Sequence, residues 1–169
     1  SLKQYLDLVA LGTVCDVVQL KGLNRAFVKE GIDVIAKKQR LGIEGLRAIS
    51  SSKDIGVTEL GFRIGPRINA AGRTGASDLG FRLLTSQSDD EVMAISERLN
   101  NLNQQRQNIE QTVLFEATNI IEEELASKKL NSIPNSIVVN GEGWHLGVLG
   151  IVASRLKEKY YRPSFVVST

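Results

Sequence analysis

Apolar residues recur along this 169-residue chain at spacings that predict mostly helical segments. Residues 4–18 are apolar on nearly every side, which is typical of a buried helix, and this helix is expected to break near residues 12–16. Amphipathic helices are predicted over about 24–38 and 42–49, where polar residues alternate with apolar ones at helical spacing. The three serines at 50–52 are predicted to form a loop after the second of these helices.

The clearest local pattern begins at Ser88. Ser88 and Glu91 fit a capping box, with acidic residues in the positive first turn of the following helix. Behind this cap, apolar residues recur at three- and four-residue spacings, with one lapse at Gln105 and Arg106, and they predict a helix over about 89–127. Such a helix would be roughly 55–60 Å long at 1.5 Å per residue, and a helix of that length usually spans two domains.

The C-terminal segments predict a strand, a helix and a second strand. We expect strands at 136–140 and 164–167, a turn at 141–147 and a helix over 148–160. This order is a βαβ unit, the beginning of a parallel or mixed sheet. Two strands and one helix cannot bury a sheet on both faces, so this domain is expected to be incomplete. Because the chain starts at Ser1 instead of a methionine and stops two residues after the last strand, both ends are expected to be cut from a longer protein.

The composition excludes several kinds of functional site but does not identify one. One histidine and one cysteine argue against a zinc site, a disulfide framework or a multi-histidine metal site, while carboxylate metal sites stay open. A net charge of +2 means that nucleic-acid binding must come from local clusters of charge. The sequence shows no targeting or membrane segment, and a single cysteine without an export signal predicts a cytoplasmic setting.

Residues 58–80 form a basic, glycine-rich region that predicts no long regular element. Glycines let backbone N–H groups approach an anion, and guanidinium groups bind phosphate oxygens in pairs, so the region is a candidate phosphate site. The alternative is a solvated loop in which the arginines pair with carboxylates. The arginines of this region are Arg63, Arg67 and Arg73.

Two aspartates lie among apolar residues near the N-terminus. Asp16 is flanked on both sides by apolar pairs, where an ionised carboxylate is costly unless it is hydrogen-bonded, paired or bound to a cation. It is either a cation ligand or a cap on a neighbouring backbone turn. Asp7, with Lys3 in reach on the same helix, is expected to be structural.

His145 is placed just before the predicted C-terminal helix. A helix N-terminus favours anions, which makes His145 a candidate neutral partner for phosphate or metal-bound water, against the alternative of a structural turn residue. Leu146 stands where a dinucleotide-binding GxGxxG motif requires glycine, so that motif is excluded. Trp144 could stack on a base or belong to the core. The close-packing face of the helix is predicted to consist of Gly147, Gly150 and Ala153.

Three segments, at 5–18, 60–73 and 144–156, together resemble the RecJ single-stranded-DNA exonucleases of the DHH phosphoesterase superfamily. The resemblance runs in order over essentially the whole chain. It implies an α/β fold in three parts. These parts are the C-terminal part of a DHH catalytic domain (1–87), a long connecting helix (88–130) and an incomplete N-terminal part of a DHHA1 domain (134–169).

The resemblance also implies residue roles. Asp16 corresponds to a catalytic ligand of Mn²⁺ or Mg²⁺, and His145 to a catalytic residue facing the phosphate. The implied chemistry is two-metal hydrolysis of single-stranded DNA in the 5′-to-3′ direction, in recombination and repair, with DNA repair proteins as further partners. The implied nucleic-acid and phosphate contacts are Arg67, Asn69, Arg73, Ser154 and Arg155, with Arg73 the preferred phosphate contact.

The chain departs from the family pattern at its ends. The earlier DHH motifs, which hold most of the metal, would lie before Ser1, and the late glycine-histidine motif of DHHA1 would lie beyond Thr169. Cys15 stands where the family is associated with a small residue such as alanine. The isolated chain is therefore expected to be inactive. Two alternatives stay open: a phosphoesterase for short oligonucleotides within the superfamily, and a non-catalytic binding or scaffold module.

Overall fold

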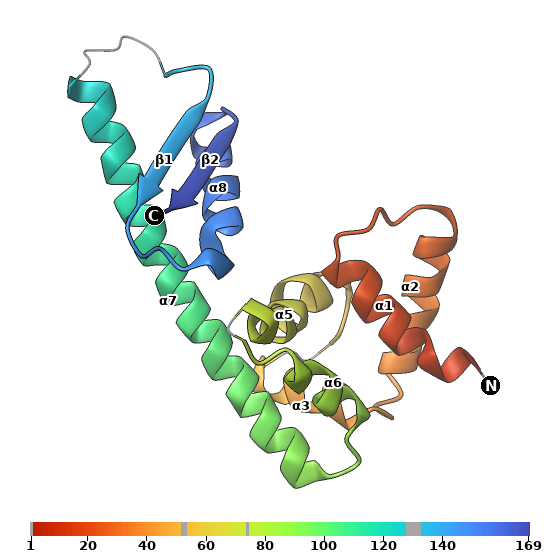
Figure 1. The fold of residues 1–169 in the computed structure, drawn as a ribbon. Helices are drawn as coiled ribbons and strands as arrows, with labels where there is room; N and C mark the ends of the chain where they lie inside the picture. Colours follow the sequence, from red (N-terminus) through yellow and green to blue (C-terminus); the bar gives the residue numbers. More distant parts are fainter. Residues whose placement is uncertain (1, 52–53, 74, 128–132) are drawn as a thin grey trace. The chain divides into compact units, whose positions relative to one another are not determined.

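A computed structural model of the chain describes residues 2–51, 54–73, 75–127 and 133–169 (Figure 1). The chain divides into two compact units, unit 1 (Ser1–Asn103) and unit 2 (Gln104–Thr169). Unit 1 is helical throughout its described elements, whereas unit 2 combines helices with a two-stranded sheet. The architecture is mostly helical α/β.

Unit 1 begins with η1 (Leu2–Tyr5), α1 (Leu6–Cys15) and α2 (Gly22–Ile35). The helices α1 and α2 lie side by side and pack against each other (Figure 1). The predicted break of the first helix is confirmed, because α1 ends at Cys15 and Asp16 forms its C-cap. The second predicted helix is also confirmed, with both of its ends lying two to three residues closer to the N-terminus than expected.

The expectation that residues 4–18 are buried on nearly every side is wrong. Val9, Val17 and Val18 are 40%, 88% and 42% exposed, and Asp16 is exposed as well. Within unit 1, α1 packs mainly against α2, so the side of the helix away from that contact stays open to solvent. After the helix the chain turns outward through Val17, which has a positive φ of 56°. An apolar stretch shows which residues are suited to burial. The elements that pack against it determine which of these residues are buried.

The basic, glycine-rich segment is helical, which corrects the prediction of an irregular region. The helix α4 (Val57–Glu59), the π-helix η2 (Leu60–Ile64) and α5 (Gly65–Arg73) follow one another without interruption. Leu60 and Ile64 are fully buried in the core of unit 1. Burial of this apolar side stabilises the segment enough to offset the low helix propensity of its glycines.

Gly65 lies where this segment packs against the end of α1. A Cβ atom at Gly65 would lie 2.6 Å from Cys15 Sγ and 2.9 Å from the carbonyl oxygen of Leu60. Burial, assisted by the negative charge of Asp16, raises the pKa of Cys15 to about 11, so the thiol is neutral at pH 7. It packs there as a small apolar group. The missing side chain of Gly65 therefore lets α5 begin directly against the end of α1.

Unit 1 also contains α3 (Leu41–Ile49), α6 (Asp78–Thr85) and the N-terminal part of α7 (Asp89–Ser127). The predicted helices over 42–49 and 89–127 are thereby confirmed. Side chains from these helices fill one core together with those of α1, α2 and η2. The fully buried leucines of this core are Leu46, Leu60, Leu83 and Leu99.

Only half of the predicted capping box at the start of α7 is formed. The Ser88 hydroxyl accepts a hydrogen bond from the Glu91 N–H at 3.3 Å, as expected. The Glu91 carboxylate does not return to Ser88; it accepts bonds from the Arg82 guanidinium and the Ser86 hydroxyl, both at 2.8 Å. These two donors lower the pKa of Glu91. The start of α7 is thus fastened to α6 as well as capped.

Unit 2 is built on β1 (Ile137–Gly141), α8 (Leu146–Tyr160) and β2 (Ser164–Ser168), together with the C-terminal part of α7. The strands are parallel and pair in register from Ile137 with Ser164 to Gly141 with Ser168, which confirms the predicted βαβ unit (Figure 1). Buried side chains of α7, β1 and α8 form a second core.

The packing face of α8 is not the one that the small residues predicted. Its buried positions recur every four residues, so they form one apolar stripe that packs into the core of unit 2. Gly150 meets open space instead, because nothing lies within 4 Å of a Cβ atom built there. In the part of the chain that the structure describes, no helix is long and apolar enough to cross a membrane. The buried positions of α8 are Val148, Val152, Leu156 and Tyr160.

Candidate nucleic-acid interface

The predicted site residues are distributed over both units. Unit 1 carries four of them and unit 2 carries three, and each set is positioned by its own elements. Within unit 1, the contact between Cys15 and Gly65 brings Asp16 close to the start of α5. The unit 1 residues are Asp16, Arg67, Asn69 and Arg73, and the unit 2 residues are His145, Ser154 and Arg155.

Asp16 presents its carboxylate to solvent at the C-terminal end of α1. Its backbone N–H donates to the carbonyl oxygen of Gly12 at 3.0 Å, which closes the last turn of the helix. Among the described residues, the Asp16 side chain accepts no hydrogen bond, so it does not cap a backbone turn as the alternative proposed. The backbone of Asp16 is therefore fixed by the last turn of α1, while its carboxylate stays exposed to solvent.

Arg63 and Arg67 are bonded only to neutral groups within the described part of the chain. Arg63 donates to the carbonyl oxygen of Ser50 at 3.2 Å, and Arg67 donates to the Asn100 side-chain oxygen at 3.0 Å and to the carbonyl oxygen of Arg63 at 2.5 Å. Partial burial, assisted by the positive charge of Arg63, lowers the pKa of Arg67. The alternative in which these two arginines pair with carboxylates is therefore wrong, and their positive charge is not compensated locally.

Other arginines of unit 1 do pair with carboxylates. Arg40 pairs with Asp7, Arg47 with Glu44, and Arg82 with Glu91. This difference matters because a guanidinium that already binds a carboxylate gains less from a phosphate than one that binds carbonyl oxygens. The segment from η2 to α5 is thus a part of unit 1 where an anion is favoured.

Asn69 and Arg73 extend this basic segment along α5. Both side chains are exposed, and their spacing of four residues places them on one face of the helix. Asn100 was not predicted as part of the site. It anchors Arg67 from α7, and its only signal in the sequence was a polar residue beside the apolar stripe of that helix.

The unit 2 residues are arranged along α8. His145 is the N-cap residue, as predicted, and its Nδ1 accepts a hydrogen bond from the Gly147 N–H at 3.0 Å. A neutral imidazole that accepts at Nδ1 carries its hydrogen on Nε2, so a donor remains for a ligand. The structure therefore gives His145 a structural task, and its catalytic role stays a prediction.

Ser154 and Arg155 are exposed farther along α8. Arg155 lies 3.5 Å from Glu110 and 3.9 Å from Glu158, so its charge is partly compensated, unlike that of Arg63. His145 is the N-cap and Arg155 lies ten positions later, which separates them by about 15 Å along the helix axis. They could contact different phosphates of one strand but not a single phosphate.

Trp144 belongs to the core of unit 2. It is only 6% exposed, and its Nε1 donates to the Glu116 carboxylate at 2.7 Å. A Cβ atom at Gly141 would overlap the indole ring, so glycine at the end of β1 makes room for the tryptophan. Of the two alternatives for Trp144, base stacking is wrong and the core position is confirmed.

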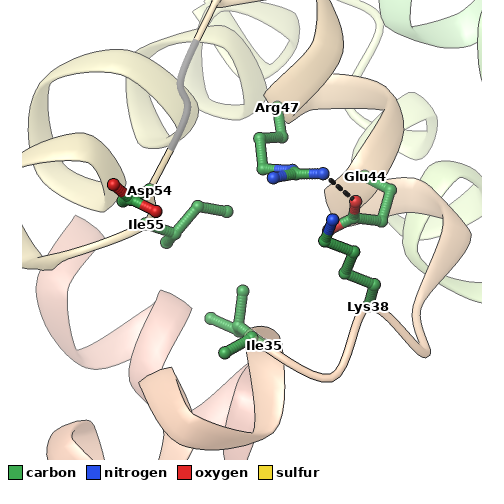
Figure 2. Close-up of a pocket in the computed structure, with 7 residues that line it drawn as sticks. Ile35, Lys38, Glu44, Arg47, Asp54 and Ile55 are labelled. Carbon is green, nitrogen blue, oxygen red and sulfur yellow. Dashed lines mark hydrogen bonds and ion pairs between the residues drawn. The ribbon is translucent and has the colours of Figure 1, made fainter.

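A small pocket of about 160 Å³ in unit 1 lies apart from these residues. Figure 2 shows the Arg47 guanidinium directed at the Glu44 carboxylate, at 2.6 Å, with Lys38 beside them. None of the predicted site residues lines this pocket, and the charges that it contains neutralise one another. It is not part of the candidate interface.

Comparison with known proteins identifies relatives over nearly the whole chain. Over 166 residues, the chain is 39% identical to the single-stranded-DNA-specific exonuclease RecJ of Escherichia coli (strain K12), covering 96% of this chain and 28% of that protein. It is 34% identical to RecJ of Bacillus subtilis (strain 168), covering 97% of this chain and 20% of that protein. The crystal structure of RecJ in complex with Mg²⁺ from Thermus thermophilus matches with a TM-score of 0.85 and 36% identity, over 98% of this chain and 25% of that chain. No protein-family model matches the chain.

In sequence and in fold, the chain is thus a homologue of single-stranded-DNA-specific exonucleases over one region of those proteins. These relatives are RecJ proteins, and the resemblance expected from the three segments is confirmed. The chain spans 28% of the length of the Escherichia coli protein and 25% of the Thermus chain. It corresponds to a partial RecJ-like region.

Proposed function

We propose that the chain is a DNA-binding part of a RecJ-type exonuclease, which hydrolyses single-stranded DNA in the 5′-to-3′ direction during DNA recombination and repair. The observation that carries the proposal is the identity of 39% over 96% of the chain with a single-stranded-DNA-specific exonuclease. The uncompensated charge of Arg63 and Arg67 supports it, since phosphate oxygens are the anions that such guanidinium groups bind best.

We assign the chain to parts of two domains and the helix that connects them. Residues 1–87 belong to the C-terminal part of a DHH domain, 88–130 to a connecting helix and 134–169 to the first part of a DHHA1 domain. The continuous helix α7 and the parallel strands of unit 2 support this assignment.

Asp16 is the residue that we propose as a metal ligand. The Thermus RecJ structures contain Mg²⁺ or Mn²⁺. The described residues of this chain include no group of three or more histidine, cysteine, aspartate or glutamate side chains that could hold a metal ion, so they do not make a metal site by themselves. Asp16 offers one exposed carboxylate, a ligand type that both ions prefer. We assign it as one ligand of a site whose other ligands lie outside this chain.

The remaining residues are assigned to phosphate. Arg73 and Asn69 contact the strand directly from the exposed face of α5, and Arg67 contributes charge while it fastens α5 to α7. His145 offers its Nε2 hydrogen at the N-terminus of α8. Ser154 and Arg155 contact the strand farther along that helix.

The purified chain is expected to release no nucleotides from 5′-phosphorylated single-stranded DNA in the presence of Mn²⁺, because one carboxylate cannot hold the metal. The measurement follows a 5′-labelled strand by denaturing gel electrophoresis, with Escherichia coli RecJ as the positive control. Degradation that co-elutes with the chain and is lost in Asp16→Ala would contradict this expectation.

The chain is expected to bind single-stranded DNA in a salt-sensitive way, and Arg73→Ala should weaken this binding about tenfold, as loss of one charge-assisted phosphate contact would. Fluorescence anisotropy against salt concentration measures both the affinity and its salt slope, which should fall by about 1 or slightly less. Arg82→Ala is the matched control, because Arg82 is exposed but paired with Glu91. Equal affinities of the wild type, Arg67→Ala, Arg73→Ala and Arg155→Ala would argue against the interface.

A second function agrees with the same structure. The described residues contain no complete metal-ligand group, which suits a non-catalytic binding module as well as part of an enzyme. Exchanging the chain for the matching region of Escherichia coli RecJ separates the two. A chimera that degrades single-stranded DNA, and loses this activity in Asp16→Ala, supports the enzyme; a folded chimera that binds DNA but never cleaves it supports the module.

A further inference from the structure

Phe62 is an aromatic side chain in the basic segment that the packing of unit 1 does not use. It lies in η2 between the fully buried Leu60 and Ile64, yet it is 81% exposed. An aromatic residue of this size normally gains from burial, and a helix with two buried neighbours does not need it for folding. The ring is therefore free to serve a contact outside unit 1.

Phe62 shares one helical segment with Asn69 and Arg73. The segment is helical without interruption from Val57 to Arg73, through the π-helix η2 into α5. All three side chains are exposed, whereas Ile64 and Ala70 are buried in the core. An aromatic ring, an amide and a guanidinium group of this segment are thus all open to solvent.

The charge beside Phe62 distinguishes it from a second exposed phenylalanine of unit 1. Arg63 follows Phe62 and binds the neutral carbonyl of Ser50. Phe81 on α6 is also exposed, at 72%, but Arg82 beside it is paired with Glu91 at 2.8 Å. An aromatic ring next to uncompensated positive charge suits a ligand that combines apolar rings with anionic groups. Phe81 has no such charge beside it, because Arg82 already binds the Glu91 carboxylate.

We infer that Phe62 is a stacking platform for a base of single-stranded DNA, with Arg63 and Arg73 contacting phosphates of the same strand. Base stacking on an aromatic ring combined with a basic groove is the general means by which proteins hold single strands without reading their sequence. A duplex is disfavoured, because its bases are already stacked on one another. This inference rests on the proposed function and adds to it the residue that selects unpaired bases.

The test compares the full chain with its variants Phe62→Ala, Phe62→Trp and Phe81→Ala. The first probe is a fluorescein-labelled, 5′-phosphorylated oligothymidylate about 12 nucleotides long, within the usual site size for a single-strand binder. The second probe has the same length and the same phosphates but abasic sugars. Circular dichroism and thermal unfolding verify that each variant is folded, which is expected because both phenylalanines are exposed.

Phe62→Ala is expected to bind oligothymidylate about tenfold more weakly than the wild type, the loss typical of one stacked base. It should bind the abasic strand as the wild type does. Phe62→Trp should retain affinity for oligothymidylate, and Phe81→Ala should change neither affinity.

Three results would overturn the inference. If Phe62→Ala leaves the affinity for oligothymidylate unchanged while Arg73→Ala lowers it, the stacking role is wrong and the proposed function stands. If Phe62→Ala weakens both probes equally, the ring supports the local structure or a protein contact instead of a base. If the wild type binds neither probe, the stacking role and the proposed DNA-binding function fail together.

Discussion

Replacing Asp7 with alanine is expected to lower the free energy of unfolding of the chain by about 3 kcal/mol, the lower end of the range for breaking a buried ion pair. Asp7 is 4% exposed and pairs with Arg40 through Arg40 Nε at 2.5 Å. Arg40 also donates to the carbonyl oxygen of Leu84 at 2.9 Å. This ion pair thus joins α1, the residue before α3 and the end of α6. Without Asp7, the half-buried guanidinium would keep its charge and lose its counter-ion.

Urea unfolding monitored by circular dichroism measures this effect. The matched control is Asp78→Ala, which removes an exposed carboxylate 4.0 Å from Arg82 and should change the free energy of unfolding very little, because exposed ion pairs contribute little. Similar losses for Asp7→Ala and Asp78→Ala would show that the buried pair contributes no more than a surface pair. The structural role that the sequence predicted for Asp7 would then be unsupported.

The second large effect is expected at Gly65. Gly65→Ala should lower the free energy of unfolding by about 2 kcal/mol, because its Cβ would lie 2.6 Å from Cys15 Sγ and 2.9 Å from the Leu60 carbonyl oxygen. Either α1 or α5 would have to shift to relieve this overlap. Since α5 carries Arg67 and Arg73, the variant should also bind single-stranded DNA more weakly than the wild type.

A double-mutant cycle with Cys15→Ala isolates the contact between the two helices. Cys15→Ala removes the sulfur atom, so the double variant should recover part of the stability lost in Gly65→Ala. Recovery should be incomplete, because the Leu60 carbonyl oxygen remains in place. Purely additive losses would mean that Cys15 and Gly65 do not constrain each other. Gly72→Ala is a matched control on the same helix, since nothing lies within 4 Å of its Cβ position.

A net charge of +2 gave no clear indication of DNA binding, and the pairing of the arginines in the structure explains why. The chain carries 21 basic and 19 acidic residues, so its total charge is close to balanced. Binding depends on which arginines have a carboxylate partner. Arg82 has one, while Arg63 and Arg67 bind oxygens without charge. A count of residues cannot separate these cases, because the partners come from positions distant in the sequence.

The sequence by itself determined the regular elements with strong periodicity. A helix over about 89–127 was predicted and α7 runs from Asp89 to Ser127, and the parallel βαβ unit followed from the order of its segments. In both cases the local pattern agrees with the tertiary packing, since the apolar stripe of the helix and the apolar strands are the surfaces that become buried. The motif order at 5–18, 60–73 and 144–156 also predicted the resemblance to RecJ, which the comparisons confirm.

Only the tertiary structure decided that the basic segment is helical and that Asp16 beside it is exposed. Five glycines at 58–80 predicted an irregular region, but burial of Leu60 and Ile64 against the core makes the segment helical. Asp16 was expected among buried residues and is exposed, because α1 ends one residue earlier and the chain turns outward. Local sequence determines which residues favour a helix, a strand or burial. Burial itself and charge compensation depend on atoms that only the folded chain brings together.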